Sequence, residues 1–328
     1  LNINYDEMYG RTLPKRILGY WKKQRLFKKR LNECLCNIRP DITISLLRRD
    51  INFINKVKDG SIKIGEIHFN KSDYRAFNDN HLPMFLQRIV KEHWRRQLIR
   101  QLRQLKRFIV LSHEDAAQWT ELNNVSVIYN PLPFYPGVSS DNSQKQVIAV
   151  GRYVPQKGFD RLIPAWKIVS EQHPDWTLRI YGDGMREKLQ QQIDSLGISS
   201  NCVLEHSVPN IVDKYCESSI FVLSSRFEGF GMVIIEAMAC GVPPVSFTCP
   251  CGPRDIITDS KDGLLVENGD IEGLAGKICY LIENEKVRKE MGKQARINVE
   301  RFKIEHVAQE WRELFETLTK QPYSDQLS

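Results

Sequence analysis

The stretch Arg226-Phe-Glu-Gly-Phe-Gly-Met-Val-Ile-Ile-Glu236 decides how this sequence is interpreted, because it places two carboxylates around one glycine-containing turn. The apolar run 220–223 before it predicts a buried strand, and residues 232–240 predict a helix that ends at Gly241. Glu236 then lies about one turn into that helix, among apolar neighbours at helical spacing. Burying a bare carboxylate costs free energy, so Glu236 must be paired or must accept hydrogen bonds from a bound group, such as the adjacent hydroxyls of a sugar.

The turn between the two carboxylates has the composition of an anion site. Gly229 and Gly231 let the main chain approach a ligand closely, and the first amides of the following helix present unpaired donors at its positive end. A phosphate group fits both features. The alternative for this segment alone is an ordinary strand-turn-helix with a chance Glu, because short motifs often mislead.

A second cationic turn lies upstream in the same half of the sequence. The apolar run 147–150 predicts a strand, and Gly151-Arg-Tyr-Val-Pro-Gln-Lys-Gly158 follows it, before a helix from Phe159. Arg152 and Lys157 therefore follow the carboxyl end of a strand, where open α/β sheets bind ligands. Arg provides a planar fork and Lys a mobile point charge, which together suit a diphosphate. A solvated surface charge is the simpler explanation for either residue alone.

These segments resemble the retaining GT-B glycosyltransferases of the group 1 family. The resemblance covers roughly residues 105–315 and is most specific between 151 and 266, because five motifs occur in the order and spacing of that family. Two positions depart from the family pattern: Asp255 stands where a Glu is usual, and the nearby loop reads Cys249-Pro-Cys251. The matching motifs are Gly151-Arg-x4-Lys-Gly, Tyr181-Gly-Asp-Gly, Glu228-x7-Glu236, the segment 236–243 and Gly263-Leu-Leu-Val.

The resemblance implies a role for each matching residue. Arg152 and Lys157 would hold the diphosphate of a nucleotide-activated sugar, Glu236 its ribose hydroxyls and Glu228 the hydroxyls of the donor sugar. His68, after a predicted strand, resembles a histidine that lies near the donor sugar in many family members; a hydrogen bond within its loop is the alternative. Ser112 is expected to cap the helix that begins near His113, to which we assign no catalytic role. The remaining donor-binding residues would be Gly151, Gly229, Phe230, Gly231 and Met232.

The composition is that of an ordinary globular protein with an uneven distribution of charge. Residues 1–137 contain 25 Lys and Arg against 13 Asp and Glu, a net charge of +12, whereas the remainder contains 22 against 27, a net charge of −5. No apolar run approaches the ~20 residues of a membrane span. The eight cysteines lack framework spacing and the histidines lack metal-ligand spacing. Free thiols and no catalytic metal or other cofactor are therefore expected.

Two basic segments account for much of the positive charge. Residues 11–30 contain nine basic residues and no acid, and residues 88–107 contain eight basic residues and one acid. Basic helices with aromatic residues suit an anionic membrane surface, although a core-facing helix with a solvated back explains the apolar stripe equally well. That stripe consists of Ile89, Trp94, Leu98, Leu102 and Leu105. We expect a cytoplasmic protein and, further, peripheral contact with the inner face of the membrane.

The order of predicted elements indicates an α/β protein with two domains. Strands near residues 146, 178, 203, 220, 244 and 264 alternate with helices, which predicts a parallel doubly wound sheet. We expect an N-terminal Rossmann-like domain over 1–134, joined by a C-terminal helix at 304–320, and a facing nucleotide-sugar-binding domain over 143–303. The first strand and Gly-rich loop of the family have no match here. We therefore expect either a fragment or a naturally reduced N-terminal domain, with weakened activity.

The function implied is that of a retaining hexosyltransferase in the synthesis of a bacterial capsule or lipopolysaccharide. It would move a sugar from a nucleotide diphosphate sugar, expected to be a UDP-sugar, to a saccharide or lipid-linked acceptor. A nucleotide-sugar-binding protein without transferase activity is the alternative. A nucleic-acid-binding protein fits the basic segments alone, but the sequence offers no stacking aromatics on strands and no recognition helix. We therefore expect no nucleic acid partner.

Overall fold

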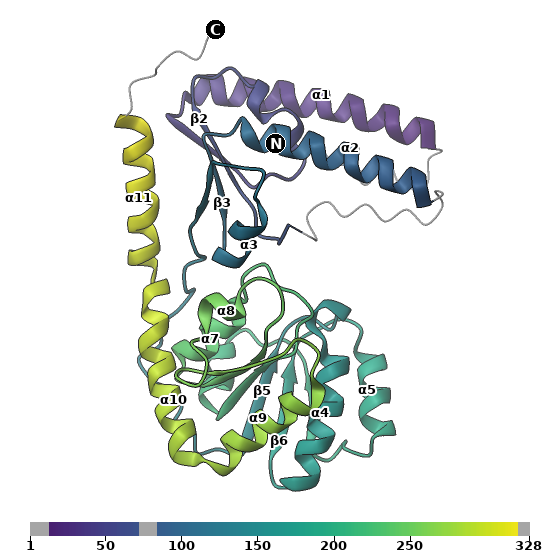
Figure 1. The fold of residues 1–328 in the computed structure, drawn as a ribbon, viewed down its shortest axis with the longest axis vertical. Coiled ribbons are helices and arrows are strands. Elements are labelled where there is room, and N and C mark those ends of the chain that lie inside the picture. The colour runs from purple at the N-terminus through teal and green to yellow at the C-terminus, as the bar shows by residue number, and fades with distance from the viewer. Residues whose placement is uncertain (1–12, 72–83, 321–328) are drawn as a thin grey trace. The chain divides into compact units, whose positions relative to one another are not determined.

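The computed structural model describes residues 13–71 and 84–320, which form two compact units (Figure 1). Unit 1 comprises the described residues within Leu1–Val110, Ala116–Ile128 and Trp311–Ser328. Unit 2 comprises Leu111–Asp115 and Tyr129–Glu310. Each unit is built on its own parallel sheet, so each is described separately.

Unit 2 contains a six-stranded sheet in the order β10-β9-β8-β5-β6-β7, and every neighbouring pair is parallel. The predicted parallel sheet is therefore confirmed. Its strands read as near-continuous apolar runs because helices cover both faces, as in other parallel sheets. The strands are β5 (Gln146–Val150), β6 (Thr177–Tyr181), β7 (Cys202–Glu205), β8 (Ile220–Leu223), β9 (Pro244–Phe247) and β10 (Leu264–Val266).

Alternation along the central strand β5 divides the core of unit 2 in two. Val147 and Ala149 belong to one buried cluster with α4 and α9, whereas Ile148 belongs to another with α7. Successive side chains of a strand point to opposite faces, so a five-residue strand supports both layers. The helical segments of unit 2 are η4 (Pro155–Lys157), α4 (Phe159–Gln172), α5 (Arg186–Ser195), α6 (Ile211–Cys216), α7 (Met232–Ala239), α8 (Pro253–Ile256), α9 (Ile271–Glu283), α10 (Glu285–Asn298) and η5 (Val299–Phe302).

Unit 1 contains a four-stranded parallel sheet in the order β1-β2-β3-β4. Its strands are β1 (Ile42–Ser45), β2 (Ile62–Glu66), β3 (Arg107–Val110) and β4 (Val125–Val127). Two short 3-10 turns lie between β1 and β2, where a longer crossover helix is common. The helical segments are α1 (Leu13–Ile38), η2 (Asp50–Asn52), η3 (Ile54–Lys56), α2 (Met84–Arg103), α3 (His113–Gln118) and α11 (Ile304–Lys320). The first residues of both α3 and α11 belong to unit 2.

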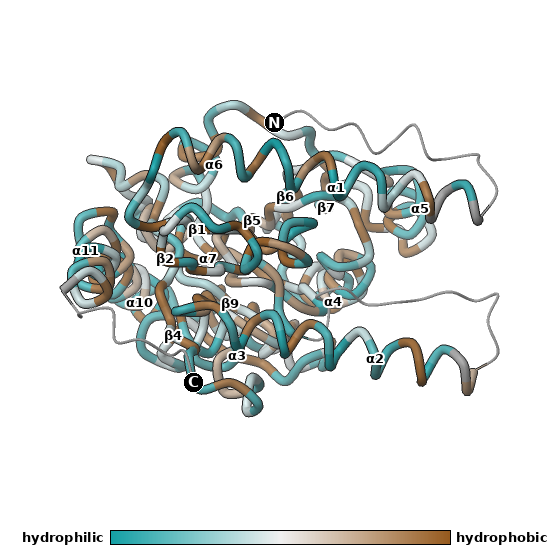
Figure 2. The backbone as a smooth tube through the Cα atoms, turned by 90° about the horizontal axis from the view of Figure 1, so that it is seen from above, coloured by the Kyte–Doolittle hydropathy of each residue, from teal (hydrophilic) through white to brown (hydrophobic). Residues whose placement is uncertain are grey.

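The apolar stripe of α2 divides into two parts. Leu102 and Leu105 are buried in the core of unit 1, whereas Ile89 and Trp94 keep 61% and 47% of their surface exposed. The core-facing interpretation therefore holds for the C-terminal end of the helix and fails for its beginning. Figure 2 shows hydrophilic and hydrophobic residues alternating along both α1 and α2.

The polar segment before β5 is packed within unit 2. Ser140 donates to the Ser218 carbonyl at 2.6 Å, and the Asn142 amide donates to the Gly241 carbonyl at 2.9 Å. Both side chains are buried, so their hydrogen bonds satisfy groups that water cannot reach. These hydrogen bonds fix the position of the segment that leads into β5.

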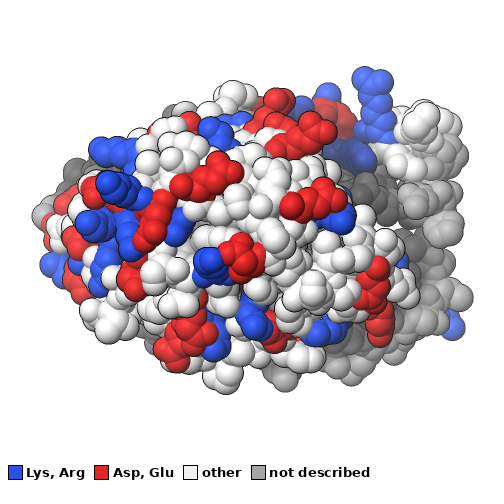
Figure 3. Space-filling model, turned by 90° about the horizontal axis from the view of Figure 1, so that it is seen from below, with Lys and Arg blue, Asp and Glu red and all other residues white. Residues whose placement is uncertain are grey.

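Charged side chains of both signs mix on the face seen in Figure 3, where Lys and Arg are interspersed with Asp and Glu. Mixed charge of this kind is typical of a solvated surface rather than a single-sign binding field. Within residues 13–71 and 84–320, no helix combines the length and the apolar character that a bilayer span requires.

Candidate functional site

The strand order of unit 2 creates one place where two loops diverge from neighbouring strands. From β5 the chain runs to β6 and β7 on one side, and then crosses back to β8, β9 and β10 on the other. The strand order therefore reverses between β5 and β8, and their loops, 151–158 and 224–231, leave from the same carboxyl edge. Such a switch point is where open α/β sheets bind ligands. Both predicted motifs lie at it.

Close backbone contacts hold the two loops together. Gly158 has φ of 65°, and a Cβ at this position would lie 2.0 Å from the Ser224 carbonyl oxygen, so only glycine fits. Ser224 Oγ donates to the Lys157 carbonyl at 2.9 Å, and the Arg226 N–H donates to the Gln156 carbonyl at 2.8 Å. The site therefore has a fixed main-chain frame before any ligand binds.

An ion pair joins the two predicted motifs. Lys157 Nζ lies 2.8 Å from Glu228 Oε1, and Ser225 Oγ donates to the same carboxylate oxygen at 2.6 Å. Only 15% of the Lys157 side chain and 7% of the Glu228 side chain is exposed. A pair this deep is costly to break, because removing one partner leaves a desolvated charge. The structure thus brings Lys157 and Glu228 together, and Ser225 is a contributor that the sequence analysis missed.

Glu236 lies on α7, as predicted, and its carboxylate has a partner within the protein. The Tyr215 hydroxyl donates to Glu236 Oε2 at 3.1 Å. Burial raises the pKa of Glu236 above its usual value, against the opposing effects of the Tyr215 hydrogen bond and the nearby Lys157 cation. The contact of Glu236 with a bound group stays a prediction, and its internal partner Tyr215, on α6, carries no signal in the sequence that could have identified it.

The helix α7 begins at a glycine, which leaves its first amides without a side-chain acceptor. Gly231 has φ of 101° and occupies the N-cap position. Met232 follows as the first helical residue and is half-buried. Unpaired N–H groups at a helix start, together with the positive end of the helix dipole, favour an anion. Phe230 contributes only main chain here, because its ring is buried against Tyr129 and Phe302.

Two arginines of these loops have different environments. Arg226 forms a bidentate ion pair with Asp160 at 2.7 and 2.6 Å, and its hydrogen bonds lower the pKa of Asp160. Arg152 is exposed, and within the described part of the chain its side chain forms no ion pair or side-chain hydrogen bond. Arg226 therefore braces the loop against α4, whereas Arg152 is available to a ligand.

Three other predicted positions lie outside this cluster. His68 belongs to unit 1, where its Nε2 lies 3.2 Å from Glu66 Oε1 at the end of β2. Ser112 caps α3 as predicted, since its Oγ accepts from the Asp115 N–H at 3.0 Å. Asp255 accepts from the His113 N–H at 2.8 Å, so the residue that departs from the family pattern has a structural role.

The cysteines and the possible metal ligands are located in the structure as well. All eight cysteines are free thiols, as expected. Among the residues that the structure describes, no group of three or more His, Cys, Asp or Glu side chains is placed to hold a metal ion.

Comparison with known proteins relates this geometry to a family. Residues 136–298 match the family model described as glycosyl transferases group 1. An uncharacterized glycosyltransferase of Haemophilus influenzae is 30% identical over 63% of this chain and 60% of its own length. The poly(ribitol-phosphate) alpha-N-acetylglucosaminyltransferase of Staphylococcus aureus is 28% identical over 76% of this chain and 51% of its own length. The chain thus spans less than two thirds of the length of these relatives.

A solved structure of similar fold also contains a bound nucleotide. The crystal structure of S. aureus TarM with fondaparinux, alpha-GlcNAc-glycerol and UDP is 27% identical, with a TM-score of 0.64 over 78% of this chain and 51% of that chain. HepE of Anabaena in complex with UDP is 20% identical and has a TM-score of 0.75, over 90% of this chain and 82% of that chain. The expected GT-B α/β fold is confirmed.

Proposed function

We propose that this chain, whose residues 136–298 match the model of the glycosyl transferases group 1 family, transfers a sugar from a nucleotide diphosphate sugar to an acceptor hydroxyl. The observation that carries the proposal is the grouping of Lys157, Glu228 and Glu236 at the switch point of unit 2. One cation and two carboxylates, on two adjoining loops and on the helix α7 that follows the second loop, match the parts of such a donor, namely phosphates and hydroxyls.

Lys157 can bind the donor diphosphate while it remains paired with Glu228. An ammonium group has three N–H donors, and the pair with Glu228 uses one of them. The exposed guanidinium of Arg152 supplies a planar fork to the same diphosphate, and the amides at the start of α7 supply further donors. Each charged hydrogen bond of this kind contributes about 1.5–3 kcal/mol, or tenfold or more in affinity.

The two carboxylates then bind hydroxyl groups. Glu236 binds the ribose hydroxyls of the nucleotide. Hydrogen bonds from those hydroxyls replace the hydration that burial removed, so they favour the ionised carboxylate. Glu228 binds hydroxyls of the donor sugar in addition to its contacts with Lys157 and Ser225. The proposed donor is a UDP-sugar, which agrees with the UDP bound to the related S. aureus protein.

The proposed reaction keeps the configuration at the anomeric carbon. The acceptor oxygen forms a bond to that carbon on the face from which the diphosphate leaves, and the carbon–diphosphate bond breaks. The acceptor proton passes to an oxygen of the departing phosphate. Lys157, Arg152 and the α7 amides stabilise the charge that develops on that group, which is usually the largest catalytic contribution. The role that the resemblance gives to His68 stays a prediction.

Calorimetric titration of UDP beside a transfer assay tests the proposal. Binding of UDP together with release of UDP from a UDP-sugar, dependent on a saccharide acceptor, is the expected result. Binding of UDP without turnover over a panel of UDP-sugars and acceptors would favour the alternative, a nucleotide-sugar-binding protein. Failure to bind any nucleoside diphosphate would contradict both.

A peripheral contact of unit 1 with an anionic membrane is a second part of the proposal. It is supported by the start of α2, where Phe85 and Ile89 keep 65% and 61% of their surface exposed beside the cations Arg88 and Lys91. Apolar side chains flanked by cations are typical of interfacial helices. Co-sedimentation with phosphatidylglycerol vesicles, compared with neutral vesicles, tests it; equal binding to both would contradict an electrostatic contact.

A further inference from the structure

A basic groove lies in unit 1, between α1 and the segment that follows η3. Its volume is about 460 Å³, and it is open to solvent. The residues that line it are Arg25, Lys28, Lys29, Asn32, Glu33, Lys56 and Lys58. Five of these seven side chains are cationic and one is acidic.

Apolar packing holds the two walls of the groove in place. Phe27 and Leu31 of α1 pack against a buried cluster that includes Phe53 and Val57. The rings of Phe27 and Phe53 meet edge to face, with centroids 5.2 Å apart. Val57 is therefore buried while its chain neighbours Lys56 and Lys58 are exposed beside the cations of α1. The groove is a consequence of the packing and does not depend on a ligand.

The cations of the groove are hardly neutralised by the protein itself. Lys29 lies 3.9 Å from Glu33, at the limit of an ion pair. Within residues 13–71 and 84–320, the side chains of Arg25, Lys28, Lys56 and Lys58 form no ion pair. Like charges gathered in a concave place raise the local positive potential and concentrate anions there. The favourable occupant carries several negative charges.

The burial of two lining residues favours an occupant that can reach below the exposed cations. Lys28 and Asn32 are half-buried, so a flat bilayer would reach the exposed rims before it reached them. Lysine ammonium groups bind phosphate as point charges, and the Asn32 amide adds a hydrogen-bond donor. We propose that this groove binds a soluble chain of phosphate groups, and that it engages a phosphodiester-containing acceptor. The acceptor part of this statement rests on the proposed transferase function.

Short-chain inorganic polyphosphate is the probe that tests this proposal, with the full chain and with a Lys28→Gln/Lys56→Gln variant. The expected result is that polyphosphate binds the native protein, and that affinity falls on the order of 50-fold between about 50 and 200 mM salt, as four engaged cations imply. The double variant should bind about tenfold more weakly or worse, with a shallower salt dependence. Lys261→Gln/Lys286→Gln, at exposed positions of unit 2, removes the same charge and should bind within about twofold of the native protein.

Two outcomes would overturn the proposal. Equal weakening in both double variants would mean that polyphosphate responds to net charge alone. Groove-dependent binding to phosphatidylglycerol vesicles without binding to polyphosphate would assign the groove to a bilayer. UDP titrated into the same samples reports the donor site separately. Loss of UDP binding would therefore count against the transferase proposal, while polyphosphate binding would still decide the groove.

Discussion

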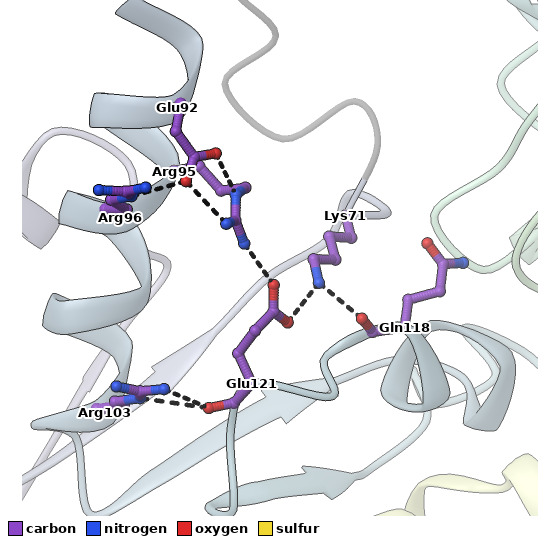
Figure 4. Close-up of polar contacts among 7 residues, drawn as sticks. All are labelled: Lys71, Glu92, Arg95, Arg96, Arg103, Gln118 and Glu121. Carbon is purple, nitrogen blue, oxygen red and sulfur yellow. Dashed lines mark hydrogen bonds and ion pairs between the residues drawn. The ribbon is translucent and has the colours of Figure 1, made fainter. Parts of the chain in front are cut away.

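Two groups of paired charges in this protein differ in sequence separation and in burial. At the switch point of unit 2, Lys157 and Glu228 form a pair of which 15% and 7% of the side chains is exposed. On α2 of unit 1, Arg95 and Arg96 both bind Glu92, with exposures of 49%, 75% and 39% (Figure 4). The Lys157–Glu228 pair joins two loops at the carboxyl edge of the sheet. The group on α2 is a solvated network on one helix.

Burial decides what each group can do. Hydrogen bonds from Arg95 and Arg96 lower the pKa of Glu92 to about 2, yet water screens exposed pairs of this kind and they add little to stability. The α2 network extends to Glu121, which also binds Lys71 and accepts from Arg95 (Figure 4). Its arginines are thus partly neutralised. A count of basic residues along the sequence overstates the positive field of α2.

The largest expected effect is that of breaking the buried pair. Lys157→Met should destabilise the fold by about 3 kcal/mol, because Glu228 is left desolvated and unpaired. It should also weaken UDP binding by about 100-fold, since a charged contact to phosphate is lost. Chemical denaturation and calorimetric titration measure the two effects.

The control for that variant is Lys157→Met/Glu228→Gln. Removing both charges should restore most of the lost stability, while UDP affinity stays low. If Lys157→Met is as stable as the native protein, then the pair behaves like the solvated α2 network and the comparison is wrong.

A smaller effect is expected at Glu236. Glu236→Gln should weaken the binding of uridine, which has a ribose and no phosphate, by about tenfold, because the amide accepts hydrogen bonds less strongly than a carboxylate. The variant should be at least as stable as the native protein, since it removes a desolvated charge. Unchanged uridine affinity, measured by calorimetry, would exclude Glu236 from the ribose site.

The raised pKa of Glu236 also predicts how stability depends on pH. Burial raises the pKa in the folded protein above its value in the unfolded chain, so the fold binds the proton more tightly. Proton binding by Glu236 therefore adds to the free energy of unfolding. This addition is fully present below the usual pKa of about 4.5 and is lost as pH rises through the pKa of Glu236 in the folded protein. The difference in free energy of unfolding between native and Glu236→Gln protein should grow in favour of the variant over that range. A pH-independent difference would mean that Glu236 titrates normally.

The smallest effect is expected on α2. Arg95→Gln/Arg96→Gln should shift the unfolding midpoint by less than about 2 °C, because the exposed network adds little to stability. Polyphosphate affinity should stay within about twofold of that of the native protein. A loss as large as that of Lys28→Gln/Lys56→Gln would show that α2, and not the groove, carries the anion-binding surface.

The sequence predicts the α/β fold and the two loops that carry the motifs, for physical reasons. Buried parallel strands are continuous apolar runs, so the strands of unit 2 could be located, and the motifs after β5 and β8 share one edge because the strand order reverses there. Contacts between distant segments could not be predicted. Neither the Tyr215–Glu236 hydrogen bond nor the split of the α2 stripe has a local pattern, since both depend on which helix packs where.

The same limit applies to charge. The sequence identifies α1 and α2 equally as basic, but only the fold places Lys56 and Lys58 beside the cations of α1 and puts Glu121 beside Arg95. Burial and pairing arise from tertiary contacts. A run of basic residues therefore indicates a candidate anion-binding surface, but it does not indicate how strong the positive potential of that surface is.

Titration of UDP against native protein and Arg152→Gln tests the central claim most directly. Arg152 is exposed and forms no ion pair within the described residues, so its removal should leave the unfolding midpoint unchanged. UDP should bind the native protein, Arg152→Gln should bind UDP about tenfold more weakly, and uridine affinity should be the same for both. Equal UDP affinity for native protein and variant would contradict a diphosphate site at the β5–β8 edge.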